Sequence, residues 1–264
     1  MNHKKTINVL FVADIIGKPG FETTQEFLPK LKDKFSIDFC IANGENGANG
    51  KGLTESIAKR YFDLGIDVVT GGNHSWTNAG FRNFLNLSKR VLRPHNYPHE
   101  APGSGTAVFE LPGGFKVGII NLQGRTFMYP IECPFKTALE EIERIRQKTN
   151  IIIVDMHAEA SAEKIALAWY LDGKVSAVIG THTHVQTADE RILPKGTAYI
   201  TDAGMTGPHD TVIGMDVEIA IKRFLYQIPE RYIVGKGNNR LCGVVIEIDS
   251  ENGRAVKIQR INVP

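Results

Sequence analysis

The sequence predicts an α/β sandwich in which mixed sheets are flanked by helices. Apolar runs of strand length alternate with amphipathic helical segments in the early part of the chain, which is typical of α/β folds. The end of the chain is instead rich in strand-like runs. Two predicted hairpins exclude a strictly parallel sheet, because a short turn joins only antiparallel strands.

Composition indicates an ordinary globular protein. The 264 residues are expected to form a single domain, residues 1–264, because no composition break marks a linker. A formal charge of +2 without a basic block gives no reason to expect a nucleic-acid complex. The apolar stretch near the N-terminus is too short for a signal peptide or a membrane span. Three cysteines without paired spacing predict reduced thiols and a cytoplasmic protein.

The first half of the chain predicts three buried strands separated by helices. The strands are expected at 7–13, 37–42 and 67–70, and each is followed by a polar, glycine-containing segment. A turn is expected at 17–20, and helices are expected at about 22–34 and 54–64. Helical spacing returns after residue 75 and gives way to a proline-rich loop that ends near 102.

The second half begins and ends with a predicted hairpin. Strands near 106–110 and 116–121 flank a Pro-Gly-Gly turn, and a capping box at 137–140 is expected to open a helix. The apolar run 151–156 is expected to be a central strand. The remaining elements are a helix at 161–171, strands at 177–179 and 198–201, a helix at 216–225, and a closing hairpin of 244–248 with 255–261. An edge of that hairpin is a candidate contact for a homo-oligomer.

Metal-ligand side chains follow five of the predicted strands. Gly180-Thr181-His182-Thr183-His184 comes directly after strand 177–179, and two histidines at i and i+2 of extended backbone point to the same side. The other strand ends supply Asp14, Glu45, Asn46, Asn73, His74 and His157. Ligands collect at the carboxyl ends of strands in such folds, so these side chains are expected to share one crevice. Mixed oxygen and nitrogen donors without a thiolate suit iron, manganese, zinc or cobalt.

The number of donors exceeds the need of one four-coordinate ion. It fits two ions about 3.5–4 Å apart that share a carboxylate and an activated water. Hydrolysis of a phosphoester is the leading use of that arrangement.

The order and spacing of these motifs resemble the calcineurin-like metallophosphoesterase superfamily. The matching segments run from Asp14 through Glu45, Gly72-Asn73-His74 and His157 to the 180–184 motif. Three departures are informative: Ile16 stands where the superfamily has a histidine, Glu45 replaces an aspartate, and Thr181 is an extra residue. With these variants the chain resembles a bacterial subfamily of 2′,3′-cyclic-nucleotide 2′-phosphodiesterases.

The resemblance implies an enzyme that converts 2′,3′-cyclic nucleotides into 3′-nucleotides through a metal-bridging hydroxide. One ion would be held by Asp14, Glu45, Asn46 and His184, and the other by Glu45, Asn73, His157 and His182. Iron or manganese is favoured, and zinc also accepts these ligands. His74 would be a catalytic residue that assists the departing alkoxide.

Several alternatives stay open at this stage. Asn46 either binds a metal or stabilises its own loop, and Arg125 either clamps a phosphate or is a surface arginine. The aromatic residues Trp76, Phe127 and Tyr129 either stack on a nucleobase or pack in the core. The substrate is expected to be a small phosphodiester, with a general phosphodiesterase or phosphomonoesterase as the first alternative. A metal- or nucleotide-binding regulator with little turnover is the second.

Overall fold

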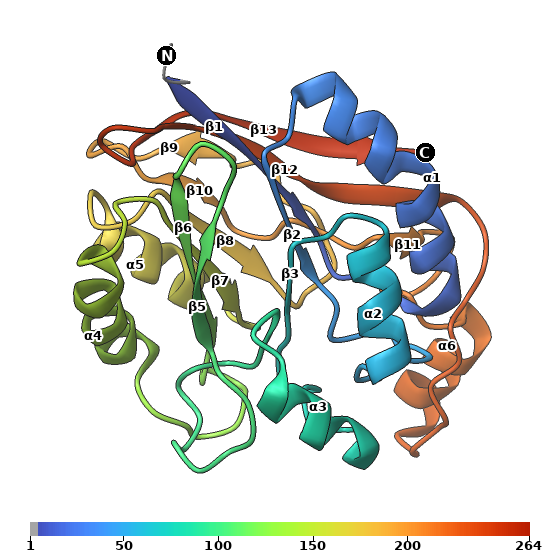
Figure 1. Cartoon of the computed structure of the whole chain (residues 1–264). Coiled ribbons are helices and arrows are strands. Elements are labelled where there is room, and N and C mark those ends of the chain that lie inside the picture. Colours follow the sequence, from blue (N-terminus) through green and yellow to red (C-terminus); the bar gives the residue numbers. More distant parts are fainter. Residues whose placement is uncertain (1–4) are drawn as a thin grey trace.

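Two mixed β-sheets face each other in the computed structural model, which describes residues 5–264 (Figure 1). The first sheet has the order β11-β12-β1-β2-β3-β4, and β13 pairs with β12. Its strands are β1 (Thr6–Val12), β2 (Phe39–Asn43), β3 (Val68–Thr70), β4 (Val91–Leu92), β11 (Gly207–Pro208), β12 (Asn239–Asp249) and β13 (Ala255–Val263). β1 to β4 are parallel, whereas β12 is antiparallel to β1 and β13 to β12.

The second sheet has the order β5-β6-β7-β8-β10-β9. Its strands are β5 (Thr106–Glu110), β6 (Lys116–Gln123), β7 (Ile152–His157), β8 (Ala177–Thr181), β9 (Arg191–Ile192) and β10 (Ala198–Ile200). β6, β7, β8 and β10 are parallel, and β5 and β9 are antiparallel additions at the two edges. The predicted mixed architecture, the central position of β7 and both hairpins are therefore confirmed.

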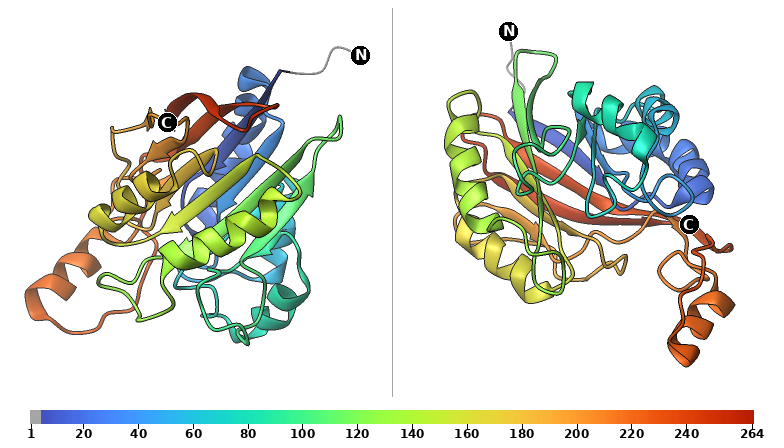
Figure 2. Two further views of the ribbon diagram at one scale, coloured as in Figure 1. Left: turned by 90° about the vertical axis from the view of Figure 1, so that its left-hand side faces the viewer. Right: turned by 90° about the horizontal axis from the view of Figure 1, so that it is seen from below.

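Helices cover the outer face of each sheet (Figure 2). The helices are α1 (Gly17–Phe35), α2 (Glu55–Asp63), η1 (Ala79–Phe81), α3 (Arg82–Leu87), α4 (Pro134–Arg146), α5 (Ser161–Leu171) and α6 (Val217–Tyr226). α1, α2 and α3 pack on the first sheet, and α4 and α5 pack on the second. Alternation along β1 shows the layering: Val9 and Phe11 point into the core between the sheets, whereas Leu10 and Val12 point towards the helices.

Two predicted helix starts are wrong. The turn expected at 17–20 is the first turn of α1, where Pro19 is tolerated because the first helical N–H groups have no intrahelical partner. The capping box expected at Thr137 is also wrong, because α4 already begins at Pro134. Thr137 is instead inside the first turn, and its N–H donates to the Cys133 carbonyl at 3.0 Å.

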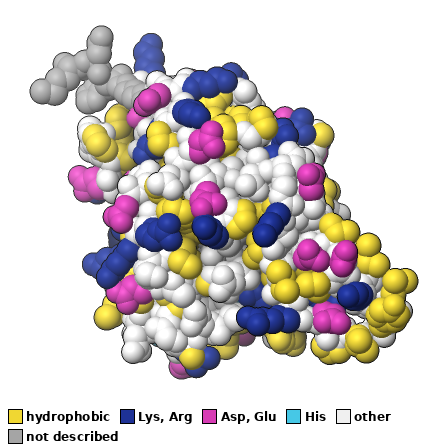
Figure 3. Space-filling model, turned by 90° about the vertical axis from the view of Figure 1, so that its right-hand side faces the viewer, with side chains coloured by type: hydrophobic (Ala, Val, Ile, Leu, Met, Phe, Trp, Pro, Cys, Tyr) yellow, Lys and Arg dark blue, Asp and Glu magenta, His cyan; other side chains and the backbone are white. Residues whose placement is uncertain are grey.

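The segment around α6 projects from the body of the molecule (Figure 2). Only Ala220 of this helix is buried, and large apolar side chains such as Phe224 and Leu225 are 75% and 68% exposed. Hydrophobic side chains accordingly gather on the projecting part of the surface (Figure 3). The base of the projection returns to the sheet ends, where the Ile213 carbonyl contacts His184. No helix in the part of the chain from residue 5 onwards is long and apolar enough to cross a membrane.

Candidate metal centre

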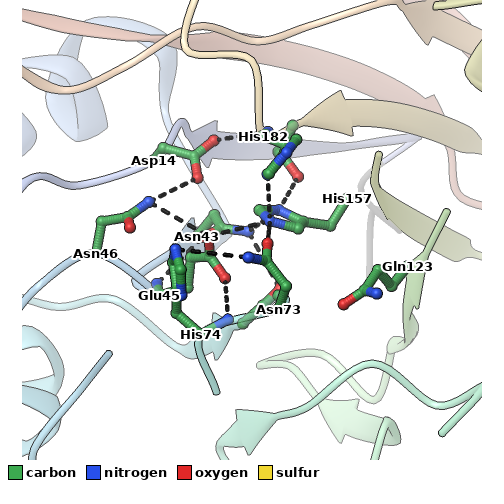
Figure 4. A network of polar contacts seen from close by, with 12 residues as sticks. Asp14, Asn43, Glu45, Asn46, Asn73, His74, Gln123, His157 and His182 are labelled. Carbon is green, nitrogen blue, oxygen red and sulfur yellow. Dashed lines mark hydrogen bonds and ion pairs between the residues drawn. The ribbon is translucent and has the colours of Figure 1, made fainter. Parts of the chain in front are cut away.

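The predicted donor side chains meet where the carboxyl ends of the parallel strands in both sheets come together (Figure 4). Asp14 follows β1, Glu45 follows β2, and Asn73 follows β3 of the first sheet. His157 is the last residue of β7, and His182 comes directly after β8 of the second. Both sheets therefore contribute, which explains why residues so distant in sequence share one site.

His157 lies at the centre of this donor cluster. Its Nε2 is 3.0 Å from Glu45 Oε1, 3.1 Å from Asn73 Oδ1 and 3.1 Å from His182 Nδ1. The donor atoms of Glu45, His157 and His182 all lie within 4.8 Å of one another. Glu45 and His157 are also fully or almost fully withdrawn from solvent.

A hydrogen-bonded chain behind His157 fixes which ring nitrogen faces the cluster. The Thr181 hydroxyl donates to Asp155 Oδ1 at 2.7 Å, so its oxygen is left to accept from His157 Nδ1–H at 2.9 Å. Asp155 is fully buried and also accepts from the hydroxyl of Thr70 (2.5 Å). Burial raises the pKa of Asp155 to about 6, which still leaves it ionised at neutral pH. His157 therefore directs Nε2 at Glu45.

The other two histidines are oriented by the same logic. His182 Nε2–H donates to Glu159 at 3.1 Å, which leaves Nδ1 without a proton on the side of His157. His184 Nδ1–H donates to the Ile213 carbonyl at 2.9 Å, so Nε2 faces Asp14. Outer hydrogen bonds of this kind are the usual support of metal-binding histidines.

The charge and protonation of the cluster suit a bound cation. Burial lowers the pKa of His157, but the carboxylates of Glu45, Asp14 and Asp155 together outweigh burial and raise that pKa to about 9. Burial and the charge of His157 lower the pKa of His182 to about 3. A proton on His157 Nε2 can satisfy one acceptor, Glu45, while Asn73 Oδ1 and His182 Nδ1 also face this nitrogen as acceptors. A cation satisfies all of them, so the donor set fits a transition-metal ion.

A second group of donors adjoins the first through Glu45. Asn46 Nδ2 lies 3.4 Å from Asp14 Oδ1, 3.5 Å from Glu45 Oε1 and 3.2 Å from His184 Nε2. His184 Nε2 is 3.7 Å from Asp14 Oδ1. Burial would raise the pKa of Asp14, but the neighbouring imidazoles of His184 and His157 together outweigh burial and lower it. The Asn46 amide presents its nitrogen here, and a half-turn of the amide would present its oxygen instead.

Residues 182–184 form an irregular turn directly after β8, so the predicted extended geometry of the two histidines is wrong. The φ angles of His182 and His184 are 99° and 64°, in the left-handed region that residues with a Cβ rarely adopt. Asp202 Oδ2 holds the turn by accepting from the backbone N–H and the hydroxyl of Thr183, at 3.1 and 2.8 Å. The ammonium of Lys164 on α5 pairs with the same oxygen at 2.7 Å, and this ion pair is buried.

Position 72 must be glycine because its Cα lies directly against the central donors His157 and Glu45. A Cβ at this position would lie 2.2 Å from His157 Nε2 and 2.4 Å from Glu45 Oε2. Any side chain here would displace the two central donors, which explains the glycine in the Gly-Asn-His motif.

The remaining predicted residues lie beside the cluster. The His74 backbone N–H donates to Glu45 Oε2 at 3.0 Å, and its ring Nε2 is 3.5 Å from Asn73 Nδ2. Partial burial lowers the pKa of His74. Arg125 is exposed on the loop that follows β6, where its backbone N–H donates to the Glu163 carboxylate. No contact between the Arg125 guanidinium and the cluster is found within residues 5–264.

Several supporting residues were not assigned a role from the sequence. They are Asp155, Glu159, Lys164, Thr181 and Asp202. Asp155 and Glu159 each lie two positions from the predicted donor His157. This closeness in sequence is the one signal that could have indicated their supporting role. Lys164 and Asp202 carry no such signal, because their partners are brought to them only by the fold.

Comparison with known proteins identifies the group to which the chain is related. The model of the YmdB-like protein family matches residues 10–261. A 2′,3′-cyclic-nucleotide 2′-phosphodiesterase of Bacillus subtilis (strain 168) is 50% identical over 255 residues, which is 97% of this chain and 96% of that protein.

Two solved structures extend the comparison to the fold. A hypothetical protein from Thermus thermophilus has a TM-score of 0.90 and 40% identity, with 98% of this chain and 100% of that chain covered. A novel phosphatase from Mycoplasma pneumoniae has a TM-score of 0.91 and 36% identity, with 99% and 94% covered. The chain therefore belongs to the YmdB-like protein family of the metallophosphoesterase superfamily.

Proposed function

We propose that the chain is a phosphodiesterase that holds two transition-metal ions and hydrolyses 2′,3′-cyclic nucleotides to 3′-nucleotides. The observation that supports this proposal most is the set of acceptor atoms around His157 Nε2. A proton on this nitrogen can pair with only one of these acceptors, whereas a bound cation can pair with all of them. The activity of the Bacillus subtilis relative, half identical to this chain along nearly its whole length, supplies the substrate class.

The two groups of donors suggest two positions for the ions. Glu45, Asn73, His157 and His182 would hold one, and Asp14, Glu45, Asn46 and His184 the other. Glu45 would belong to both positions in this assignment, because its Oε1 contacts both His157 and Asn46. The Asn46 amide would turn to present its oxygen. Iron or manganese is favoured by the oxygen-rich donor set, and zinc is the alternative.

When bound, such ions would supply an activated water and neutralise charge on the phosphoryl oxygens. Water attack on phosphorus breaks the P–O2′ bond, so the phosphate stays on O3′ and the departing O2′ gains a proton. His74 is the proposed proton donor, since it lies beside Asn73 and Glu45 without taking a place among the central donors. Arg125 is a further proposed contact for the phosphate.

A substrate panel tests this function. Protein loaded with Mn²⁺ is incubated with 2′,3′-cyclic AMP, 3′,5′-cyclic AMP, 5′-AMP and bis(4-nitrophenyl) phosphate, and the products are separated chromatographically. We expect 2′,3′-cyclic AMP to be the best nucleotide substrate and 3′-AMP to be its product. Preferred release of phosphate from 5′-AMP would favour a phosphomonoesterase, and turnover of none of the four would favour a regulator.

Removal of the Thr181 hydroxyl tests the proposed support of His157. Thr181→Val keeps the shape of the side chain but deletes the group that links His157 Nδ1 to Asp155. Loss of such an outer partner lowers metal affinity by roughly 10- to 100-fold. Competition with a metal chelator measures the change, and Thr181→Ser, which keeps a hydroxyl, is the matched control. Equal Mn²⁺ affinity in the valine variant would show that this chain of hydrogen bonds does not support a metal ligand.

Location and assembly stay proposals. A cytoplasmic protein is supported by the three cysteines, Cys40, Cys133 and Cys242, all of which are free thiols. A homo-oligomer is also proposed, and sedimentation velocity on the purified protein measures it.

A further inference from the structure

We propose that Phe127 and Tyr129 form a platform on which the base of the nucleotide stacks, an inference that rests on the proposed function. The two side chains are 89% and 68% exposed, so neither is explained by core packing. They line a cavity of about 350 Å³ together with Met128, Pro130 and two candidate metal ligands, Asn73 and His182. A ligand whose phosphate lies at the metal centre would therefore have its remaining part against these rings.

The loop that carries the platform is anchored to the site. The Gly124 N–H donates to the His157 carbonyl at 3.0 Å, which ties the loop to the central strand β7. The backbone N–H groups of Arg125 and Thr126 donate to the carboxylate of Glu163 on α5, at 3.1 to 3.3 Å. These bonds fix the direction in which the next residues leave the sheet.

Phe127 itself has an unusual backbone conformation. Its φ is 61°, a left-handed value that is unfavourable for a bulky side chain. Such strain persists where the surroundings impose it, and it is found more often at ligand sites than elsewhere. Here it holds an exposed ring in the cavity that His182 also lines.

Trp76, the third candidate for base stacking, packs against other residues of the protein. The ring of Trp76 packs on Tyr97 with centroids 4.6 Å apart, and its indole N–H donates to the Pro102 carbonyl at 3.2 Å. Trp76 is therefore a structural residue, and the proposed stacking surface consists of Phe127 and Tyr129. Stacking accepts any base, so the platform would strengthen nucleotide binding with little preference among bases.

Two substrates with the same reacting ring test this assignment. 2′,3′-Cyclic AMP and glycerol 1,2-cyclic phosphate both contain a five-membered cyclic phosphodiester, but only the first has a base. Phe127→Ala and Tyr129→Ala are each expected to lower kcat/KM for 2′,3′-cyclic AMP by roughly 5- to 100-fold, mainly through KM. The kcat/KM of these variants for glycerol 1,2-cyclic phosphate should stay within about 2-fold of the wild-type value. Phe127→Trp should retain the wild-type preference for 2′,3′-cyclic AMP over glycerol 1,2-cyclic phosphate. Phe224→Ala, which removes another exposed ring, is the matched control.

The outcomes separate the platform from the proposed function. An equal loss on both substrates would mean that the loop is only structural, and no loss on either would mean that the rings do not contact the base. If wild-type protein hydrolyses neither substrate, the proposed function fails. Calorimetric binding of 3′-AMP then tests the platform alone, since Phe127→Ala should still weaken binding at least about 5-fold. Unchanged 3′-AMP binding would overturn it.

Discussion

Glu45→Gln is expected to remove at least one metal equivalent and to lower turnover on the order of 10³-fold or more. Glu45 is almost completely buried, and its two oxygens contact His157 and the backbone N–H of His74. Glutamine keeps this size but has no charge, so it is a poor ligand between two cations. The effect should therefore appear in metal content as well as in rate.

Elemental analysis and steady-state kinetics on 2′,3′-cyclic AMP measure both effects. Glu55→Gln is the control, since Glu55 pairs with Lys59 at the surface. Glu45→Asp should restore part of the activity because it keeps the charge. Two metal equivalents and near-normal turnover in Glu45→Gln would show that this carboxylate is not the bridging ligand.

His74→Ala is expected to keep both metals and to lower kcat for 2′,3′-cyclic AMP by roughly 10²- to 10⁴-fold. The ring lies beside Asn73, and the backbone N–H of His74 donates to Glu45, but the ring is not among the atoms that converge on His157 Nε2. Its proposed task is to protonate the departing O2′. A 4-nitrophenolate leaving group needs no such proton, so the loss should be much smaller with bis(4-nitrophenyl) phosphate.

The difference between the two substrates distinguishes proton donation from a general loss of structure. His99→Ala, a change at an exposed loop histidine, serves as the control. A His74→Ala protein without metal would identify His74 as a ligand. A loss of equal size on both substrates would exclude it as the proton donor.

The sequence predicted the parts of the fold that depend on local pattern. Buried strands such as β7 can be predicted from the sequence because both faces of a central strand are covered. Most residues of such a strand are therefore apolar. The donors after those strands were predictable for the same reason, because parallel strands bring their carboxyl ends to one edge. Helix starts at Gly17 and Pro134 were missed, since proline is a signal both for turns and for first helical turns.

The geometry that makes the donors converge depends on contacts between distant segments. The positive φ angles of His182 and His184 are stabilised by Asp202, whose own charge is compensated by Lys164. The periodicity of apolar residues along the sequence does not predict contacts of this kind. The same holds for the hydrogen bond of His184 to Ile213, because the projecting segment that supplies that carbonyl returns to the site only in the folded chain.

The most direct test of the dinuclear centre is a crystal structure of the Mn²⁺-loaded protein with an anomalous difference map. We predict two peaks about 3.5–4 Å apart with Glu45 between them. One peak should contact Asn73, His157 and His182, and the other should contact Asp14, Asn46 and His184. A single peak, or peaks that do not contact Glu45 and His157, would contradict the assignment.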